Sequence, residues 1–408
     1  MASAETGTPA ETKKNSVFHR LYVGTGAFDI VGKRKRWYLF FGALVLVCLA
    51  SIGIRGFNFG IEFEGGTQIQ LPSVGTHGTI TPDEAKQVFA DTLGKQAASA
   101  QTVGVGNSAT VQLRAESLPE TDVMKVKQAL FDKLQPMGSN GQTSLQTISD
   151  SAVSASWGGE ISRQALIALG VFMVLVTIFL TFYFERWMAL AALVSLIHDI
   201  IVTAGIYSLV GFEVTPATVI GLLTILAFSL YDTVVVFDKV KENSRGLLGL
   251  TRRTYAETAN LALNQTLMRS INTSIIALLP VIGLLVVGYL LLGSGTLQDL
   301  ALVQLTGMLV GVLSSLFLAT PLLVDLKMRD PRYQQQAQRV QARRANQARK
   351  SAERDATGGT DEDFDASDDE ALEAELRKEK AYAAAASVPA RNPKAAPRRG
   401  RPAGKRKR

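Results

Sequence analysis

The apolar positions of the chain gather in six long runs, separated by short polar segments and by one polar stretch of domain size. The runs cover residues 37–54, 164–184, 188–210, 214–237, 270–292 and 297–326. Each has roughly 18 or more residues, which as a helix is enough to cross a hydrocarbon core about 30 Å thick. The pattern predicts an α-helical integral membrane protein with six transmembrane helices.

Residues 55–163, between the first and second runs, contain the short helix-like and strand-like segments that are typical of a water-exposed α+β domain. Pro82 follows the N-cap candidate Thr81, and Gly106-Asn107 lies between two strand-like segments. The expected elements are strand 67–71, helix 82–93, strands 100–105 and 110–115, helix 119–134 and a strand near 145–148. Their order, βαββαβ, is that of a ferredoxin-like domain.

Basic residues predict the orientation of the helices. Residues 33–36 are all Lys or Arg and directly precede the first run, while loop 238–268 and the chain after Lys327 are also basic. Since Lys and Arg stay on the cytoplasmic side, both termini are expected to be cytoplasmic and residues 55–163 extracytoplasmic. The polar arm 1–36 ahead of the first run makes that run a retained anchor rather than a cleaved signal peptide.

The region 327–408 is expected to be a disordered, charged cytoplasmic tail. It alternates Ala/Gln/Arg-rich, acidic and Ala/Pro-rich blocks, which bury too little apolar surface to fold alone, apart from a short helix near 370–386. A solvated tail is the simpler interpretation of its charge. Contact of its basic end with anionic lipid or ribosomal RNA is an open alternative, and no specific nucleic-acid partner is predicted.

The composition adds little support for an enzyme. The 408 residues, with a formal net charge of +7, include three His and a single Cys, Cys48, inside the first run. One thiol permits no intramolecular disulfide, and neither a Cys/His cluster, a Gly-rich phosphate loop nor a nucleophile motif is present in the sequence. We therefore expect no cofactor and no metal site, and soluble-style catalysis has little support.

Asp232, inside the apolar run 214–237, is the strongest functional signal in the sequence. A carboxyl group in hydrocarbon is costly when ionised and costly when left without a hydrogen-bond partner. Proteins that keep such a residue generally use it to carry protons or ions. Asp232 is thus the first candidate for a proton relay.

Arg269 directly precedes the fifth run and is the candidate partner of Asp232. Asn272 and Thr273 follow it at helical spacing, and Gln265 precedes it by one turn, so the four share one helix face. An Asp232–Arg269 contact would form when the carboxyl is ionised and be released on protonation, which gives two states. Alternatively, Arg269 extends to the lipid phosphates.

Further polar residues lie inside or at the ends of the runs. His198 and Asp199, near the middle of the third run, fit either a relay or a network that fastens helices together. Charged residues at the run ends are expected to be ordinary boundary residues solvated by the interface, namely Glu213, Asp299 and Asp325.

Five segments of the chain together resemble the SecF family of protein-export membrane proteins, and they occur in the order found in that family. They are 59–67, the His198-Asp199 pair, 232–243, 264–274 and 314–321. The resemblance runs from about residue 28 to 327. Two positions depart from the family pattern: Tyr231 replaces an Asn before the Asp, and Glu62 replaces an Asp.

The resemblance implies a non-enzymatic subunit of the resistance-nodulation-division superfamily in the cytoplasmic membrane of a prokaryote. It implies SecD as a direct partner, and a role with SecY, SecE and SecG in which the proton motive force assists late translocation of a preprotein that SecA has driven. The family's proton path maps onto Asp232 and Arg269. Two alternative functions stay open. The first is that of one half of a proton-driven exporter of small molecules or lipids. The second is that of a purely structural scaffold for SecD.

Overall fold

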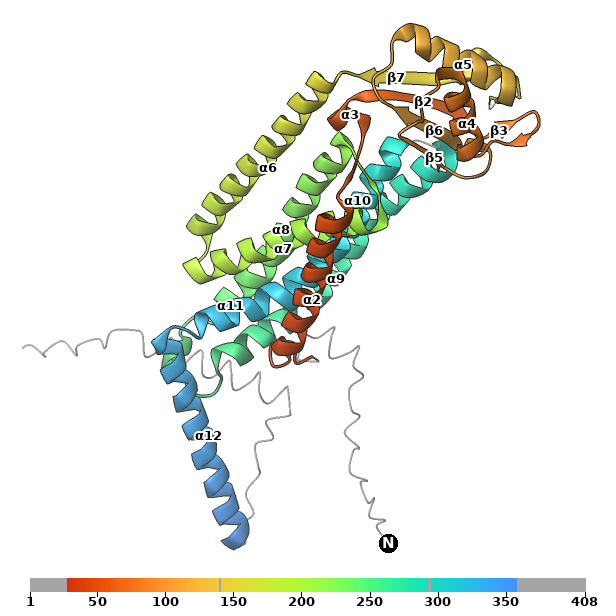
Figure 1. Ribbon diagram of the computed structural model, residues 1–408. Helices are drawn as coiled ribbons and strands as arrows, with labels where there is room; N and C mark the ends of the chain where they lie inside the picture. Colours follow the sequence, from red (N-terminus) through yellow and green to blue (C-terminus); the bar gives the residue numbers. More distant parts are fainter. Residues whose placement is uncertain (1–27, 139–140, 293–294, 358–408) are drawn as a thin grey trace, which may run out of the picture. The chain divides into compact units, whose positions relative to one another are not determined.

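The computed structural model describes residues 28–138, 141–292 and 295–357, and within them six helices are long and apolar enough to cross a membrane (Figure 1). They are α2 (Arg34–Arg55), α6 (Ala155–Tyr183), α7 (Arg186–Val210), α8 (Pro216–Asn243), α9 (Tyr255–Val286) and α10 (Gly295–Ser314). Two of them continue: α9 into a π-helical turn, Val287–Leu292, and α10 into a second, Ser315–Ala319, followed by α11 (Thr320–Lys327). The prediction of a six-span membrane protein is confirmed.

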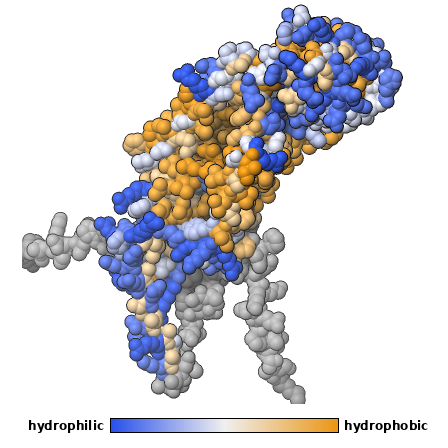
Figure 2. Space-filling model, in the orientation of Figure 1, coloured by the Kyte–Doolittle hydropathy of each residue, from blue (hydrophilic) through white to orange (hydrophobic). Residues whose placement is uncertain are grey.

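Two helices begin well before the apolar runs that predict them. Helix α6 begins at Ala155 instead of residue 164, and α9 begins at Tyr255 instead of residue 270. Polar residues can extend a helix beyond the hydrocarbon, where hydropathy no longer marks it. The surface of the helix bundle is mostly apolar, and the surface of the α+β domain is mostly polar (Figure 2).

The α+β domain lies at one end of the bundle, which we call the domain end. Its elements follow the expected strand–helix–strand–strand–helix–strand order along the chain. The antiparallel sheet has the strand order β5-β6-β2-β7, and the helices are α4 (Pro82–Leu93) and α5 (Glu120–Leu134). The strands are β2 (Gly66–Pro72), β5 (Ser99–Val103), β6 (Thr110–Ala115) and β7 (Ser149–Val153). A hairpin of two short strands, β3 (Val74–Gly75) and β4 (Gly78–Thr79), follows β2.

The last strand of the domain lies later than predicted. The sequence suggests a strand near 145–148, but Leu145–Thr147 form a 3-10 turn and β7 begins at Ser149. Strand β7 carries mostly exposed, polar side chains. Because only one of its neighbours is a strand and it covers no core, its sequence lacks the alternating apolar signal of a half-buried strand.

The sheet has an apolar face and a polar face. Ile69, Leu71, Val111 and Leu113 point into a core shared with α4 and α5. Side chains alternate along a strand, so the intervening residues of β6, Gln112 and Arg114, lie on the opposite face, and both are buried. Buried polar residues on this face require partners from elsewhere in the molecule.

Gly65 and Gly66 connect the domain to the bundle. They follow the short helix α3 (Ile61–Glu64), and their φ values of 78° and 135° lie in the region that favours glycine. A Cβ on Gly65 would lie 2.7 Å from backbone atoms of Ala155 at the start of α6. These glycines therefore allow the beginning of the sheet to pack directly against α6.

Helices α8 and α10 pack through small residues. A Cβ on Gly307 would overlap the side chain of Ile225, and one on Gly221 would overlap Val303. Gly307 and Gly311 are four residues apart on α10, the spacing that brings two membrane helices into close backbone contact. This close approach sets the position of Asp232 on α8.

Helix α12 (Pro331–Thr357) differs from the expectation of a tail disordered from residue 327. In the second compact unit of the chain, α12 holds loop 246–254 through main-chain carbonyls: Gln336 donates to Leu250 and Arg253, and Arg339 to Leu248. Amino-acid composition alone does not predict a helix that is stabilised by contacts to a loop distant in sequence. The suggested helix at 370–386, the remaining tail and residues 1–27 of the N-terminal arm lie outside the described residues.

Candidate functional site: a buried polar network in the helix bundle

Asp232 lies inside the bundle, where α8, α9 and the α10 continuation meet. It is 2% exposed. The hydroxyl of Ser315 donates a hydrogen bond to Asp232 Oδ2 at 2.8 Å. Ser270 of α9, which is fully buried, lies beside the same carboxyl group, and its hydroxyl has no other partner among the described residues. The carboxyl is thus surrounded by hydroxyls rather than by a cation.

Ser315 is the first residue of a π-helical turn. Its Oγ also lies 2.7 Å from the carbonyl oxygen of Gly311, so the hydroxyl can donate either to Asp232 or to its own helix. Single π turns inside membrane helices occur frequently at functional sites. A hydroxyl with two alternative acceptors can respond to a change in the charge of Asp232.

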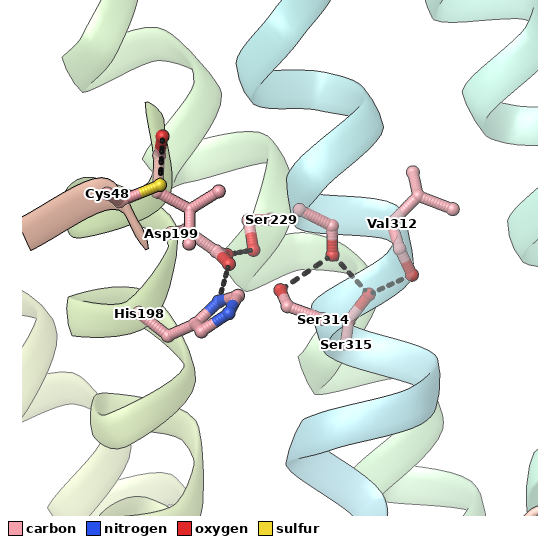
Figure 3. A network of polar contacts seen from close by, with 9 residues as sticks. Cys48, His198, Asp199, Ser229, Val312, Ser314 and Ser315 are labelled. Carbon is pink, nitrogen blue, oxygen red and sulfur yellow. Dashed lines mark hydrogen bonds and ion pairs between the residues drawn. The ribbon is translucent and has the colours of Figure 1, made fainter. Parts of the chain in front are cut away.

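A second group of polar side chains joins α7, which carries His198 and Asp199, to Ser229 of α8, one turn from Asp232 (Figure 3). His198 Nδ1 lies 3.1 Å from Asp199 Oδ1, and Ser229 Oγ donates to Asp199 Oδ2 at 2.5 Å. The edge of the His198 ring contacts Phe41, with ring centroids 5.1 Å apart. All three members, His198, Asp199 and Ser229, are buried.

Ser229 and Asp232 of α8 connect the two groups. Ser229 and Asp232 are three residues apart, so they lie on the same helix face about 4.5 Å apart along the axis. The sequence analysis identifies Asp232, His198 and Asp199 of the two groups but not their partners Ser229, Ser270 and Ser315. Serine is common in membrane helices, so only the three-dimensional contacts separate these residues from the others.

The expected Asp232–Arg269 contact is not formed, which corrects the sequence-based interpretation. Ser270 faces Asp232, and the preceding residue on a helix points about 100° away. Arg269 is accordingly exposed on the outer surface of the bundle, as is Asn272. Helical position alone does not predict the direction of the Arg269 side chain.

The other two members of that predicted face have local partners. Thr273 donates to the carbonyl oxygen of Arg269 at 3.0 Å, within its own helix. Gln265 accepts a hydrogen bond from Asn243 at 2.9 Å, which links the end of α8 to α9. Neither contacts Asp232 in the described contacts.

A third polar cluster joins the domain to the bundle. Arg114 of β6 forms an ion pair with Glu213, whose side chain is 10% exposed, and Gln101 donates to the same carboxylate at 3.3 Å. Burial lowers the pKa of the Arg114 guanidinium, and the nearby carboxylates of Glu62, Asp299 and Glu64 oppose that shift. An Arg beside these carboxylates remains charged.

This cluster corrects the expectation that Glu213 and Asp299 are ordinary boundary residues. Glu213 lies in β8 (Glu213–Val214), which pairs with β1 (Asn58–Phe59) just before α8 begins. Asp299 lies in the first turns of α10, close enough to Arg114 to affect its charge. Position at the end of an apolar run does not reveal that a folded domain covers that end.

At the opposite end of the bundle Asp325 is also paired. It accepts a hydrogen bond from Tyr38 at 2.8 Å and forms an ion pair with Arg34 at 2.9 Å. Both partners belong to α2, so Asp325 fastens the first span to the last. Its side chain is 34% exposed, which agrees with a boundary position although not with an unpaired one.

The chemistry available to the buried network is proton and hydrogen-bond exchange. Among the described residues, no group of three or more His, Cys, Asp and Glu side chains is arranged to hold a metal ion. Asp232 can take up or release a proton, and the neighbouring hydroxyls can donate or accept. The arrangement suits a membrane protein that couples proton movement to a change of shape.

Comparisons with known proteins show similarity to protein-export membrane proteins. Residues 133–329 match the family described as protein export membrane protein SecD/SecF, C-terminal, and residues 50–74 match the SecD/SecF GG motif. The protein translocase subunit SecF of Mycobacterium tuberculosis H37Rv is 51% identical over 367 residues, which cover 90% of this chain and 82% of that protein. The SecF of Streptomyces coelicolor is 42% identical over 401 residues, covering 97% of this chain and 100% of that protein.

The same similarity is found in three dimensions. The crystal structure of SecDF, a translocon-associated membrane protein from Thermus thermophilus, aligns with a TM-score of 0.63 at 27% identity. The alignment covers 74% of this chain and 38% of that protein.

The six-span fold and the comparisons thus define a multi-pass membrane subunit of a protein-export system. More specifically, the chain belongs to the SecF family of protein translocase subunits.

Proposed function

We propose that this SecF family member acts with SecD and uses the proton motive force to assist late preprotein translocation through SecY, SecE and SecG. The observation that carries the proposal is the Asp232 carboxyl, buried among Ser315, Ser270 and the start of a π turn. A titratable group kept at membrane depth with adjustable hydroxyl partners is suited to bind and release protons. The role involves no covalent chemistry, so the subunit is not an enzyme.

SecD is the proposed direct partner, because SecDF of Thermus thermophilus combines SecD and SecF in one protein and this chain matches 38% of it. The exposed side chains of Arg269 and Asn272 favour the same conclusion. A charged side chain facing lipid is costly, and a partner helix that supplies an acceptor would remove that cost. We assign this face of α9 to the SecD contact, and SecA acts indirectly by delivering the preprotein.

The domain end is proposed to face outward across the cytoplasmic membrane of a prokaryote. The segments at the opposite bundle end carry the basic residues, including Lys33–Arg36 at the start of α2 and Lys239 and Lys241 near the end of α8. The positive-inside rule then places both termini in the cytoplasm and the α+β domain outside, where it can contact an emerging preprotein. Membrane lipids surround the apolar faces.

Movement of α8 connects the proton site to the domain. Asp232 lies on α8, and the turn before α8 carries Glu213, which pairs with Arg114 of the sheet. Protonation of Asp232 removes the charge that Ser315 binds, and a shift of α8 against α10 would then displace the Glu213 attachment. A proton crossing the membrane gains about 2.3 kcal/mol per 100 mV, enough to bias two states a few kcal/mol apart.

The proposal is tested by proton uptake into vesicles that contain the purified complex with SecD. Asp232→Asn keeps the acceptor for Ser315 and removes the titratable proton, so it should abolish uptake driven by an imposed gradient. Asp238→Asn, a change of an exposed Asp on the same helix, is the matched control and should leave uptake unchanged. Normal uptake by Asp232→Asn, with SecD still bound, would reject the relay and favour a structural scaffold.

A further inference from the structure

Helix α7 carries a stripe of buried polar residues that the proposed mechanism does not yet use. Its members recur every four residues, so they lie on one face of the helix. They are Ser195 (1% exposed), Asp199 (2%), Thr203 (1%) and Tyr207 (4%). The rise from Asp199 to Tyr207 is about 12 Å, which extends from the middle of the bundle to its domain end.

Two hydroxyls of this stripe, and one nitrogen of the neighbouring His198 ring, have no hydrogen-bond partner among the described residues. Ser195 Oγ, Thr203 Oγ1 and His198 Nε2 are buried, and none of them forms a hydrogen bond with another described residue. Other threonine hydroxyls in the bundle do bond to their own helices. Thr266, which is buried, and Thr306, which is half-buried, donate to carbonyl oxygens of their own helices at 3.0 Å and 2.8 Å.

This difference matters because an unpaired polar atom in the membrane costs free energy, and a helical Thr can avoid the cost by bonding to its own backbone. Thr203 does not do so. A hydroxyl that is held away from its own helix is available to another polar group or to water. The geometry thus favours a hydrated line of groups over a set of contacts that only fasten helices.

Both ends of the stripe reach polar clusters. At the domain end, Tyr207 Oη donates to the carbonyl oxygen of Asp299 at 3.0 Å, beside the cluster of Arg114, Glu213 and Glu62. At the inner end, Asp199 accepts from Ser229, which lies one turn from Asp232. The titratable and charged groups along the line are Glu62, Arg114, Glu213 and Asp299 at the domain end and His198, Asp199 and Asp232 inside.

We propose that Tyr207, Thr203 and Asp199 of α7, with Ser229 of α8, form the path by which protons reach Asp232 from the domain end. The inference rests on the proposed function, because it names the route to that relay. Successive members of the α7 stripe rise by about 6 Å, the length of two hydrogen bonds through one water. At each step a hydroxyl oxygen or a water accepts one proton and passes on another, so charge and atoms balance.

The test measures proton uptake by vesicles containing the full chain and SecD, under an imposed gradient. Thr203→Val keeps the side-chain shape and removes the hydroxyl, so uptake should fall at least about ten-fold. Thr203→Ser restores the hydroxyl and should recover at least half of the normal rate. Tyr207→Phe keeps the ring and should also slow uptake, which provides a second variant if Thr203→Val does not assemble.

A matched control is available on α8. Thr224 is exposed and donates to the carbonyl oxygen of Ile220 in its own helix, so Thr224→Val should leave uptake unchanged. All variants should retain SecD through purification. A purely structural role for the stripe predicts weaker assembly without slower uptake by the complexes that do assemble.

The outcomes separate this inference from the proposed function. Normal uptake by both Thr203→Val and Tyr207→Phe, while Asp232→Asn is inactive, would overturn the α7 path and leave the relay intact. Uptake that is lost equally in Thr203→Val and Thr203→Ser would also overturn it, since the hydroxyl would then not be the requirement. Normal uptake by Asp232→Asn itself would contradict the proposed function instead.

Discussion

Gly311 of α10 lies directly against Ser229 of α8: a Cβ built on Gly311 would lie 2.9 Å from the Cβ of Ser229. The same Ser229 donates to Asp199, so the absence of a side chain at position 311 fixes the distance between α8 and α10 at the polar network. Close packing of membrane helices through small residues thereby holds the hydrogen-bonding groups in place.

Replacing Gly311 should disturb both packing and proton coupling. Gly311→Ala forces α8 and α10 apart, and overpacking of this kind typically costs about 1–3 kcal/mol. The thermal unfolding midpoint of the purified protein should fall. Gly283→Ala is the control, because a Cβ on Gly283 of α9 meets nothing within 4 Å, and it should leave the midpoint unchanged or raise it slightly. Equal midpoints for the two variants would contradict the packing argument.

The Arg114–Glu213 pair should hold the domain on the bundle. Both side chains are nearly buried, at 7% and 10% exposed, so Arg114→Gln leaves a carboxylate without its cation, a loss of about 3–5 kcal/mol for a buried pair. Hydrogen exchange in β6 and at the start of α8 should become faster. The exposed Lys133–Asp91 pair provides the control: Lys133→Gln should cost about 0–1 kcal/mol and leave exchange unchanged. Similar exchange in both variants would show that the cluster is not an attachment.

Helix α4 should lose stability in acid through its capping box. The backbone N–H of Thr81 donates to the carboxylate of Glu84, which lowers the pKa of Glu84 below its ordinary value of 4.5. Because the folded pKa is the lower one, the stabilisation is complete above the unfolded pKa and is lost as the pH falls through the folded pKa. Protection factors of the first α4 amides should fall over that range in the wild type. Glu84→Gln should remove this pH dependence, and its persistence would point to another group.

The sequence predicts the membrane-spanning elements and the acidic residue of the candidate site, but not the contacts between elements. Hydropathy locates the spans and Asp232, because a carboxyl in an apolar run is visible without a structure. The direction of Arg269 depends on a rotation of α9 that places Ser270 against Asp232, and the partners of Glu213 depend on where the sheet packs. Such contacts join residues far apart in sequence, so local pattern does not encode them.

The orientation proposed from the basic residues is tested by labelling. A cysteine at Gln96, on the exposed surface of the domain, should react with a membrane-impermeant thiol reagent added to intact cells. A cysteine at Ser244, just after α8, should react only after the cells are opened. The native Cys48 is buried, so the unmodified protein provides the background. Labelling of position 244 and not of position 96 in intact cells would reverse the assigned orientation.

The central claim is that a proton on Asp232 drives assistance to translocation. The most direct measurement is the completion of a preprotein arrested late in translocation, in membrane vesicles with and without a proton gradient. With SecD association confirmed, the wild type should accelerate completion only when the gradient is present. Asp232→Glu should retain part of this effect, and Asp232→Asn should show none. Full, gradient-dependent acceleration by Asp232→Asn would contradict the account.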